Sequence, residues 1–295
     1  MTIESAAGYA TGRRFAVLKP AEWQLALPLA IVYVAFFVVP LLLLVIISAF
    51  DDEKITTVGF AQWHKFLGDP FYWKVIFDTV MLGLKTVLAT ALIGYPLALV
   101  YLEAPPSWQR VILFVAILPL LTSVVVRTFA WIVILGNEGV INQTVMWLGL
   151  APAPIRLLQT EAGLVLALTQ IEMPLMLLPL LSVMSRLDPN LRDASLALGA
   201  SRWRTLFRVT LPLSLPGLIA GCTLVFASST TAFISQSVIG GNRLVYLPLL
   251  IWQQSLVVYN WPLASVTALT LLVSVGLGVV AISALGRRNE GYAHG

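Results

Sequence analysis

The segment from Ser185 to Pro212 reads SRLDPNLRDASLALGASRWRTLFRVTLP, and its local signals organise the interpretation of the whole chain. Asp188 followed by Pro189 is a typical helix start, because Asp caps free N–H groups and Pro has no N–H of its own. Residues 190–198 predict a short helix, and Gly199 predicts its end because glycine adopts positive φ without strain. The segment therefore begins with a short helix whose two ends are both encoded locally.

A second short helix is predicted directly after this glycine. Ser201 can cap a helix over residues 202–209, and Leu211-Pro212 begins the apolar run that follows. A compact helix–Gly–helix element between two apolar runs indicates a surface to which another protein binds. The open alternative is that residues 188–212 form an amphipathic loop packed on its own bundle.

Outside this segment, the composition requires a membrane environment. Of the 295 residues, 59% are hydrophobic and 11% are charged, whereas a soluble domain carries roughly 25% charged residues. A helix needs about 20 mainly apolar residues to cross the hydrocarbon core, and backbone groups facing lipid must pair within each segment. The chain is therefore predicted to be an all-α membrane protein with six transmembrane helices. They cover residues 25–50, 76–101, 111–135, 162–184, 213–234 and 262–285.

Basic residues predict the orientation, because cytoplasmic segments hold the excess of Lys and Arg. One side of the six spans collects Arg13, Arg14, Lys19, Arg110, Arg186, Arg192, Arg202, Arg204, Arg208, Arg287 and Arg288, and the other collects Lys54, Lys65, Lys74, Arg156 and Arg243. Both termini are therefore predicted to be cytoplasmic. The expected organisation is a cytoplasmic segment over 1–24, a six-helix membrane domain over 25–285 that includes the loop 185–212, and a cytoplasmic tail over 286–295.

Catalysis and nucleotide binding are not encoded in a recognisable form. The chain has no G-x-x-x-x-G-K-[ST] phosphate loop. Its single Cys222 and its two histidines, His64 and His294, do not build a Cys- or His-based metal site or a catalytic set. Its basic residues lie in short loops between apolar runs, so membrane lipid is an expected partner and nucleic acid is not. We expect no catalytic residue, no metal and no cofactor in this chain.

Polar residues inside the predicted spans are hypotheses about function, because charges at membrane depth are costly. Asp78 and Lys85 are seven residues apart and share a helix face. Glu172 precedes Met173-Pro174, where a broken helix would free carbonyl groups for a polar site. Asp78 and Glu172 are expected to touch a cationic solute. The candidates for the solute path are Asp78, Lys85, Arg127, Trp131, Glu172, Ser229, Thr230 and Gln236.

Each of these candidates also has a structural interpretation. Glu172 could pair with Lys85 or Arg127 and fix helix packing without touching solute. Ser229 and Thr230 could allow two helices to approach closely. Trp131 could belong to the aromatic belt at the membrane interface. The sequence leaves both interpretations open.

The spacing Asp193-Ala194-Ser195-x3-Gly199-x9-Val209-x-Leu211-Pro212 resembles the EAA loop of binding-protein-dependent ABC importer permeases. That loop has the form E-A-A, three residues, Gly, nine residues, Ile, one residue, Leu-Pro, so every spacing matches. Asp193 replaces Glu and Ser195 replaces the second Ala. Further stretches resemble the spermidine/putrescine branch, and the resemblance covers about residues 75–275. These stretches are Gly94–Ala98, Val126–Trp131, the loop from Gly136 to Asn142, and Asn260–Pro262.

The resemblance implies a type I ABC importer permease fold in the bacterial inner membrane. It implies a second homologous permease subunit, two ATPase subunits that hold ATP and Mg, and an external substrate-binding protein. Residues 191–200 would form the coupling helix that docks on the ATPase. The implied contact residues are Leu191, Asp193, Ala194, Ser195, Gly199 and Ala200.

The expected function is import of a small amine-containing solute, such as a polyamine, an opine or an amino-acid-like compound. The alternative is a secondary transporter or channel driven by an ion gradient, which would work as a self-sufficient chain. The helix–Gly–helix loop and the six spans favour the importer.

Overall fold

The computed structural model describes residues 20–290, and within them it leaves undescribed the side chains of residues 20–26, Pro189, Asn242 and residues 287–290. Most of the predicted N-terminal segment 1–24 and half of the predicted tail 286–295 lie outside the described residues. So do the basic residues Arg13, Arg14 and Lys19, so the predicted orientation of the termini stays a prediction.

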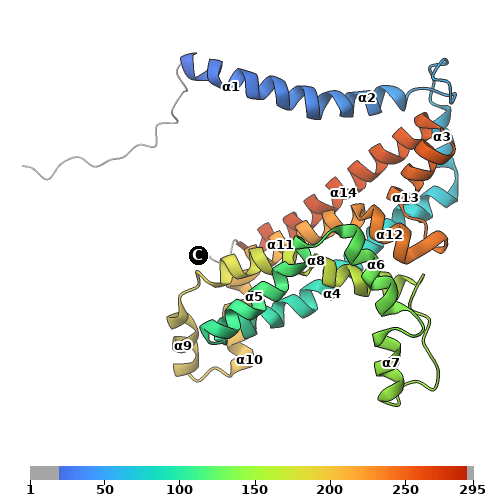
Figure 1. The fold of residues 1–295 in the computed structure, drawn as a ribbon. Coiled ribbons are helices and arrows are strands. Elements are labelled where there is room, and N and C mark those ends of the chain that lie inside the picture. Colours follow the sequence, from blue (N-terminus) through green and yellow to red (C-terminus); the bar gives the residue numbers. More distant parts are fainter. Residues whose placement is uncertain (1–19, 291–295) are drawn as a thin grey trace, which may run out of the picture. The chain divides into compact units, whose positions relative to one another are not determined.

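The chain divides into two compact units between Ile46 and Ile47, and each is described separately. The first unit contains α1 (Pro20–Tyr33), the π-helical turn η1 (Val34–Val38) and all but the last residue of α2 (Val39–Ile47), which follow one another in Figure 1. Residues Leu27–Ile47 are long and apolar enough to cross a membrane. The first predicted span is therefore confirmed as a helix, although the helix ends before residue 50.

The second unit holds the remaining helices. Those before the helix–Gly–helix element are α3 (Ala61–Gly68), α4 (Pro70–Glu103), α5 (Pro106–Leu121), α6 (Val124–Leu135), α7 (Val140–Trp147) and α8 (Glu161–Met184). The element itself and the helix that follows it comprise α9 (Pro189–Ala197), α10 (Arg202–Thr205), the π-helical turn η2 (Leu206–Thr210) and α11 (Leu211–Thr231). The last elements are α12 (Phe233–Gly240), η3 (Gly241–Arg243), α13 (Leu247–Trp252), η4 (Gln253–Val257) and α14 (Trp261–Glu290).

The centre of the second unit is the packing of α4, α8 and α11, with α14 along α11. Figure 1 shows α9 and α10 at one end of these long helices and α3 and α13 at the other, which we call the α9 end and the α13 end. In the part of the chain that the structure describes there is no strand, and the β-interaction between Phe50 and Val58 is an isolated bridge. The predicted all-α fold is confirmed.

Small residues let the central helices approach closely, as is common between helices in a membrane. A Cβ on Gly83 of α4 would lie 2.5 Å from Thr230 Cγ2 and 2.9 Å from the ring of Phe226, both on α11. A Cβ on Gly221 of α11 would lie 2.8 Å from the sulfur of Met176 on α8. These contacts fix where α11 packs against both neighbours.

Among the described residues, six stretches are long and apolar enough to span a membrane, as predicted, and the third differs most from its predicted bounds. They are Leu27–Ile47, Pro70–Glu103, Val124–Trp147, Glu161–Met184, Arg202–Thr231 and Trp261–Gly286. The prediction of one continuous helix over 111–135 is wrong, because the backbone is extended at Thr122 and Ser123 and separates α5 from α6. At this break the Thr122 hydroxyl donates a hydrogen bond to the Pro119 carbonyl at 3.0 Å.

Two further predictions about helix breaks are also wrong. Pro174 does not break its helix, because α8 continues through it from Glu161 to Met184 and loses a single N–H donor. The helix predicted over residues 202–209 is not separate from the next span, predicted to begin at Leu211-Pro212. The turn before Pro212 widens into η2, whose longer hydrogen-bonded repeat accommodates the missing donor, so α10, η2 and α11 run on without a break.

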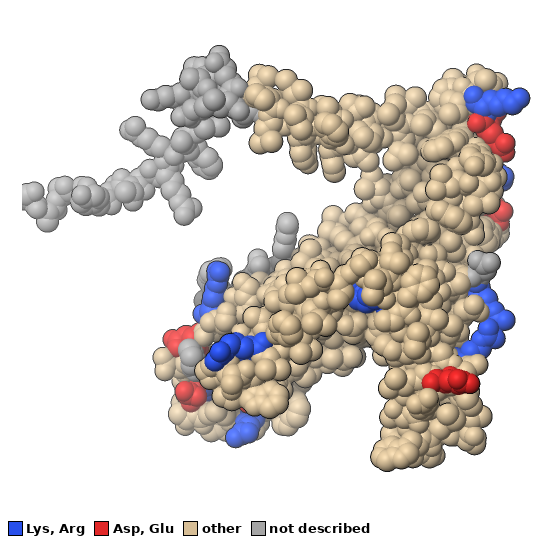
Figure 2. Space-filling model, in the orientation of Figure 1, with Lys and Arg blue, Asp and Glu red and all other residues tan. Residues whose placement is uncertain are grey.

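Charged side chains gather at the two ends of the second unit, as the face drawn in Figure 2 shows. The surface between these ends is almost entirely uncharged, apart from a small basic patch. An apolar band between two charged ends suits a protein that crosses a bilayer.

Candidate functional site

The helix–Gly–helix element at the α9 end forms as its sequence predicts. Asp188 Oδ1 accepts a hydrogen bond from the Asn190 N–H at 2.9 Å and caps α9. Gly199 ends the helix at φ +82°, and a Cβ there would meet no atom within 4 Å. Ser201 Oγ accepts from the Arg204 N–H at 3.3 Å and caps α10.

The residues predicted to contact an ATPase lie mainly on an open surface. Ser195 is half-buried because its Oγ lies 3.0 Å from Thr205 Oγ1 and joins α9 to α10. Ala200 is also half-buried, and the exposed members of the set are Leu191, Asp193, Ala194 and Gly199.

Large apolar side chains extend this exposed surface. Leu198 is 88% exposed, Trp203 is 71% exposed, and the Trp203 ring stacks on the ring of Phe207 with centroids 6.1 Å apart. Trp203 and Phe207 lie in the apolar stretch Arg202–Thr231, where exposed apolar side chains can face lipid, whereas Leu198 lies outside the six stretches. Exposed apolar surface of this kind is typical of a docking site.

Arg192 connects α9 to the long helix α4. Its guanidinium forms an ion pair with Glu103, the last residue of α4. Among the described residues, α9 makes no other side-chain hydrogen bond or ion pair outside the segment 188–210. Cavities of about 480 and 420 Å³ adjoin this ion pair, and Arg192 and Glu103 line both. The pair therefore spans an open crevice.

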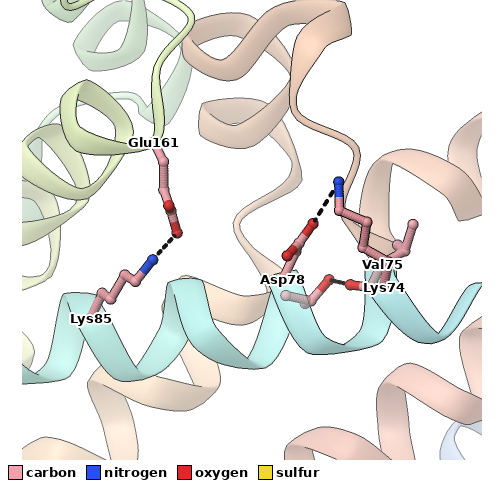
Figure 3. A network of polar contacts seen from close by, with 6 residues as sticks. Lys74, Val75, Asp78, Lys85 and Glu161 are labelled. Carbon is pink, nitrogen blue, oxygen red and sulfur yellow. Dashed lines mark hydrogen bonds and ion pairs between the residues drawn. The ribbon is translucent and has the colours of Figure 1, made fainter. Parts of the chain in front are cut away.

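At the α13 end, carboxylates from two different helices line one cavity. Asp78 of α4 and Glu161 at the start of α8 line a cavity of about 300 Å³ together with Lys74 and Tyr246. Lys85 Nζ lies 2.6 Å from Glu161 Oε1, and Lys74 Nζ lies 3.9 Å from Asp78 Oδ2. Figure 3 shows the Asp78 and Lys85 side chains on the same side of α4, as their spacing predicts.

The wall of this cavity is fixed by hydrogen bonds and contains a buried phenol. Thr79 Oγ1 accepts from the Leu247 N–H at 3.0 Å and donates to the Val75 carbonyl at 2.7 Å, which ties the chain around Tyr246 to α4. Tyr246 is 2% exposed. Burial raises the pKa of its hydroxyl, and the negative charges of Glu161 and Asp78 raise that pKa further, so the group stays protonated.

Glu172 lies apart from this cavity, in the middle of α8, and is 4% exposed. It lies eleven residues after Glu161, roughly 16 Å along the helix. Its carboxylate is close enough to the Ser228 hydroxyl and to the charge of Arg127 for both to stabilise its ionised form. Within the described residues, no ion pair of 4.0 Å or less joins Glu172 to Arg127 or to Lys85. The pairing predicted with Lys85 is wrong, because Lys85 pairs with Glu161.

Arg127 stabilises the break between α5 and α6. One of its guanidinium N–H groups donates to the carbonyl of Pro119, the same oxygen that accepts from Thr122. Its Nε is buried and has no hydrogen-bond partner among the described atoms. Arg127 on α6 thus binds a carbonyl of α5 across the break, which is a structural role.

The belt interpretation predicts that the Trp131 ring lies on an exposed surface, and the structure buries it instead. Trp131 is 9% exposed, and its Nε1 donates to Gln170 Oε1 at 3.1 Å. It lines an apolar cavity of about 430 Å³ between α4, α5 and α8. The belt interpretation is wrong, because Trp131 packs inside the unit.

The polar residues of α11 and α12 also occupy packing positions. The hydroxyls of Ser229 and Thr230 donate to the Phe226 carbonyl of their own helix at 3.3 and 2.7 Å. Gln236 is fully buried, and its Nε2 donates to the carbonyls of Ser229 and Thr230 at 2.9 and 3.2 Å. These bonds hold α12 to the end of α11 across the helix break at Ala232.

Sequence reasoning missed Glu103, Glu161 and Tyr246. Glu161 follows Thr160 at the start of a predicted span, and an acid in a first helical turn is a recognisable signal. Glu103 ends a span on the side predicted to hold Arg192. Nothing in the sequence marks Tyr246. The described residues hold no group of three His, Cys, Asp or Glu residues that could bind a metal.

The architecture defines a class: an apolar membrane protein with six candidate spans among the described residues and an exposed, capped helix pair at one end. No family model matches the chain. The spermidine/putrescine transport system permease protein PotB of Haemophilus influenzae is 32% identical over 246 residues, which cover 82% of this chain and 86% of that protein. PotB of Escherichia coli K12 is 32% identical over 228 residues, which cover 77% of this chain and 83% of that protein.

A solved structure shows the same fold. It is a bacterial alginate ABC transporter in complex with an alginate pentasaccharide-bound periplasmic protein, and the matching chain has a TM-score of 0.74 at 17% identity. The match covers 91% of this chain and 94% of that chain. The chain belongs to the family of ABC importer permease subunits that includes PotB. It is a multi-pass protein of the inner membrane, and permease subunits of this family are not enzymes.

Proposed function

We propose that this permease imports a small amine and is driven by separate ATPase subunits that dock on α9. The observation that carries the proposal is the exposed α9–α10 surface, whose single described polar link to the long helices is the Arg192–Glu103 ion pair. A docked ATPase that moves α9 would pull on α4 directly. The contact residues would be those predicted from the loop. They are Leu191, Asp193, Ala194, Ser195, Gly199 and Ala200.

The complete importer would contain a second homologous permease, two ATPase subunits and an external substrate-binding protein. ATP and Mg would reside on the ATPase subunits, because this chain has no phosphate-binding loop. The similar alginate transporter was crystallised with a loaded periplasmic protein, which supports a comparable partner for this chain.

The names of the relatives support an amine as the solute, since PotB proteins belong to spermidine/putrescine transport systems. The cavity at the α13 end fits this solute class, because Asp78 and Glu161 both line it. This is the end predicted to face the outside, where a solute would enter. Of the two acids predicted to touch the solute, Asp78 therefore lies in an accessible site and Glu172 does not.

Affinity purification of the chain in mild detergent tests the proposal. We expect a related permease and an ATPase to co-purify, and we expect loaded binding protein with putrescine or spermidine to stimulate ATP hydrolysis. Gly199→Trp should abolish ATPase association and leave membrane insertion intact. Gly149→Trp is the matched control, because Gly149 also has positive φ and open space around it but lies in a segment predicted to be external. A chain that purifies alone and transports without ATP would instead establish the gradient-driven alternative.

A further inference from the structure

We infer that the cavity between Asp78, Glu161 and Tyr246 is a binding station for a primary ammonium group of the solute, which takes the place of a lysine ammonium. This inference deepens the proposed function and rests on it. It assigns specific residues to the entry of the solute and states why binding there would be transient.

The geometry of the cavity points to a ligand. Its volume of about 300 Å³ lies at the small end of small-molecule pockets. The two carboxylates come from α4 and α8, and the Thr79–Leu247 hydrogen bond fixes the third side. A wall held in this way keeps acceptor groups in place without the ligand, which lowers the entropy lost on binding.

The buried phenol of Tyr246 supplies the second observation. The side chain is 2% exposed and lines the cavity, and its hydroxyl makes no hydrogen bond within the described structure. The hydroxyl oxygen is not closed off from solvent, so water or a ligand reaches it. An ammonium group has three N–H donors, so it can bond to a carboxylate and to the phenol oxygen together.

The charges around the cavity explain why binding would be an exchange. Lys74 and Arg243 line the cavity with the two acids, and Lys85 pairs with Glu161 from the neighbouring turns of α4. The three positive charges already exceed the two negative ones, so this site gains little from an additional positive charge. A solute ammonium can bind by replacing an equivalent lysine ammonium at the same oxygen.

This exchange is energetically accessible because the lysines are not buried. The Lys85 side chain is 46% exposed and the Lys74 side chain is 77% exposed. An exposed ion pair contributes about 1 kcal/mol or less, and a lysine ammonium on its flexible stem can turn into water. Because the solute ammonium and the lysine ammonium bind with similar free energies, the solute can leave again, as a transport path requires.

Equilibrium binding of labelled putrescine to the purified permease–ATPase complex in nanodiscs, without binding protein, tests the inference. Asp78→Asn and Glu161→Gln should each weaken binding by about fivefold, the scale of one half-exposed ion pair. Lys85→Met should tighten binding by a similar factor, because Glu161 loses its competing ammonium. Tyr246→Phe should weaken binding and leave thermal stability unchanged, because it removes a hydroxyl that has no protein partner. Glu138→Gln is the control, since Glu138 is exposed on the same predicted side and does not line the cavity.

The opposite effect of Lys85→Met separates exchange from structural damage, because a misfolded site would bind more weakly in every variant. Unchanged binding in Asp78→Asn, Glu161→Gln and Lys85→Met would overturn the station. A wild-type complex that imports putrescine but does not bind it at this site would overturn the station and leave the proposed function intact. A wild-type complex that neither binds nor imports amines would overturn both.

Discussion

Arg192 of α9 and Glu103 at the end of α4 form an ion pair across a crevice that is open on both sides. The two residues are 89 positions apart in the chain. α4 has 34 residues and is roughly 50 Å long, so the pair joins the exposed α9 surface to a helix that reaches the amine station at Asp78. A displacement of α9 would thus act directly on the helix that lines the solute entry.

Glu103→Gln should uncouple ATP hydrolysis from transport. The Arg192 and Glu103 side chains are 46% and 59% exposed, so the loss of stability should stay below about 1 kcal/mol. We expect normal assembly and basal ATP hydrolysis, with uptake per ATP reduced severalfold. Glu103→Arg and Arg192→Glu should each reduce uptake per ATP, and the double variant that carries both changes should restore it. If the double variant transports no better than the two single variants, the ion pair has no role in coupling.

Gly83→Ala should destabilise the packing of α4 on α11. The added Cβ would lie 2.5 Å from Thr230 Cγ2 and 2.9 Å from the Phe226 ring. Overpacking of this kind costs about 1–3 kcal/mol, which thermal unfolding in detergent would detect. Gly276→Ala in α14 is the control, because a Cβ there meets no atom within 4 Å. Equal melting temperatures for the two variants would contradict this packing.

Gln236→Leu should destabilise the junction between α11 and α12. The substitution removes the donor that satisfies the Ser229 and Thr230 carbonyls, and leaving buried carbonyls unpaired costs about 1–3 kcal/mol. Gln143→Leu is the comparison, because the Gln143 amide also bonds to a backbone carbonyl but at an exposed position. Chemical unfolding of the two variants should show a clear loss only for Gln236→Leu, and a loss of equal size in both would refute the assigned role.

Glu172→Gln should leave assembly and amine uptake nearly unchanged. The neutral amide remains polar beside the Ser228 hydroxyl, and Glu172 forms no close ion pair among the described residues that would be broken. We expect uptake within about twofold of the wild type, since one polar contact is replaced by another. Loss of uptake with intact assembly would show instead that Glu172 touches the solute.

The features that the sequence predicts well are local. The start and end of α9 depend on Asp188, Pro189 and Gly199, which act on backbone groups within a few residues, so their pattern is legible without a structure. The apolar spans are predicted for the same reason, because length and composition alone define them. The break at Thr122 was missed, because two residues of extended backbone inside an apolar run leave no change in hydropathy.

The partners of the charged residues could not be predicted. Lys85 and Glu161 are 76 positions apart, and only the packing of α4 against α8 brings them together. The sequence suggested Glu172 for Lys85 because both lie in predicted spans, but their depth along the helices differs. Tyr246 became a candidate only because the fold places it in the lining of the same cavity as two carboxylates.

Site-specific photo-cross-linking tests the central claim, that an ATPase docks on the α9–α10 surface, most directly. A photoreactive amino acid at Leu198, which is 88% exposed, should capture the ATPase subunit in native membranes. The same group at Leu150, which is 74% exposed in the segment after α7, should capture none of it. Capture of the ATPase from Leu150 and not from Leu198 would contradict the account.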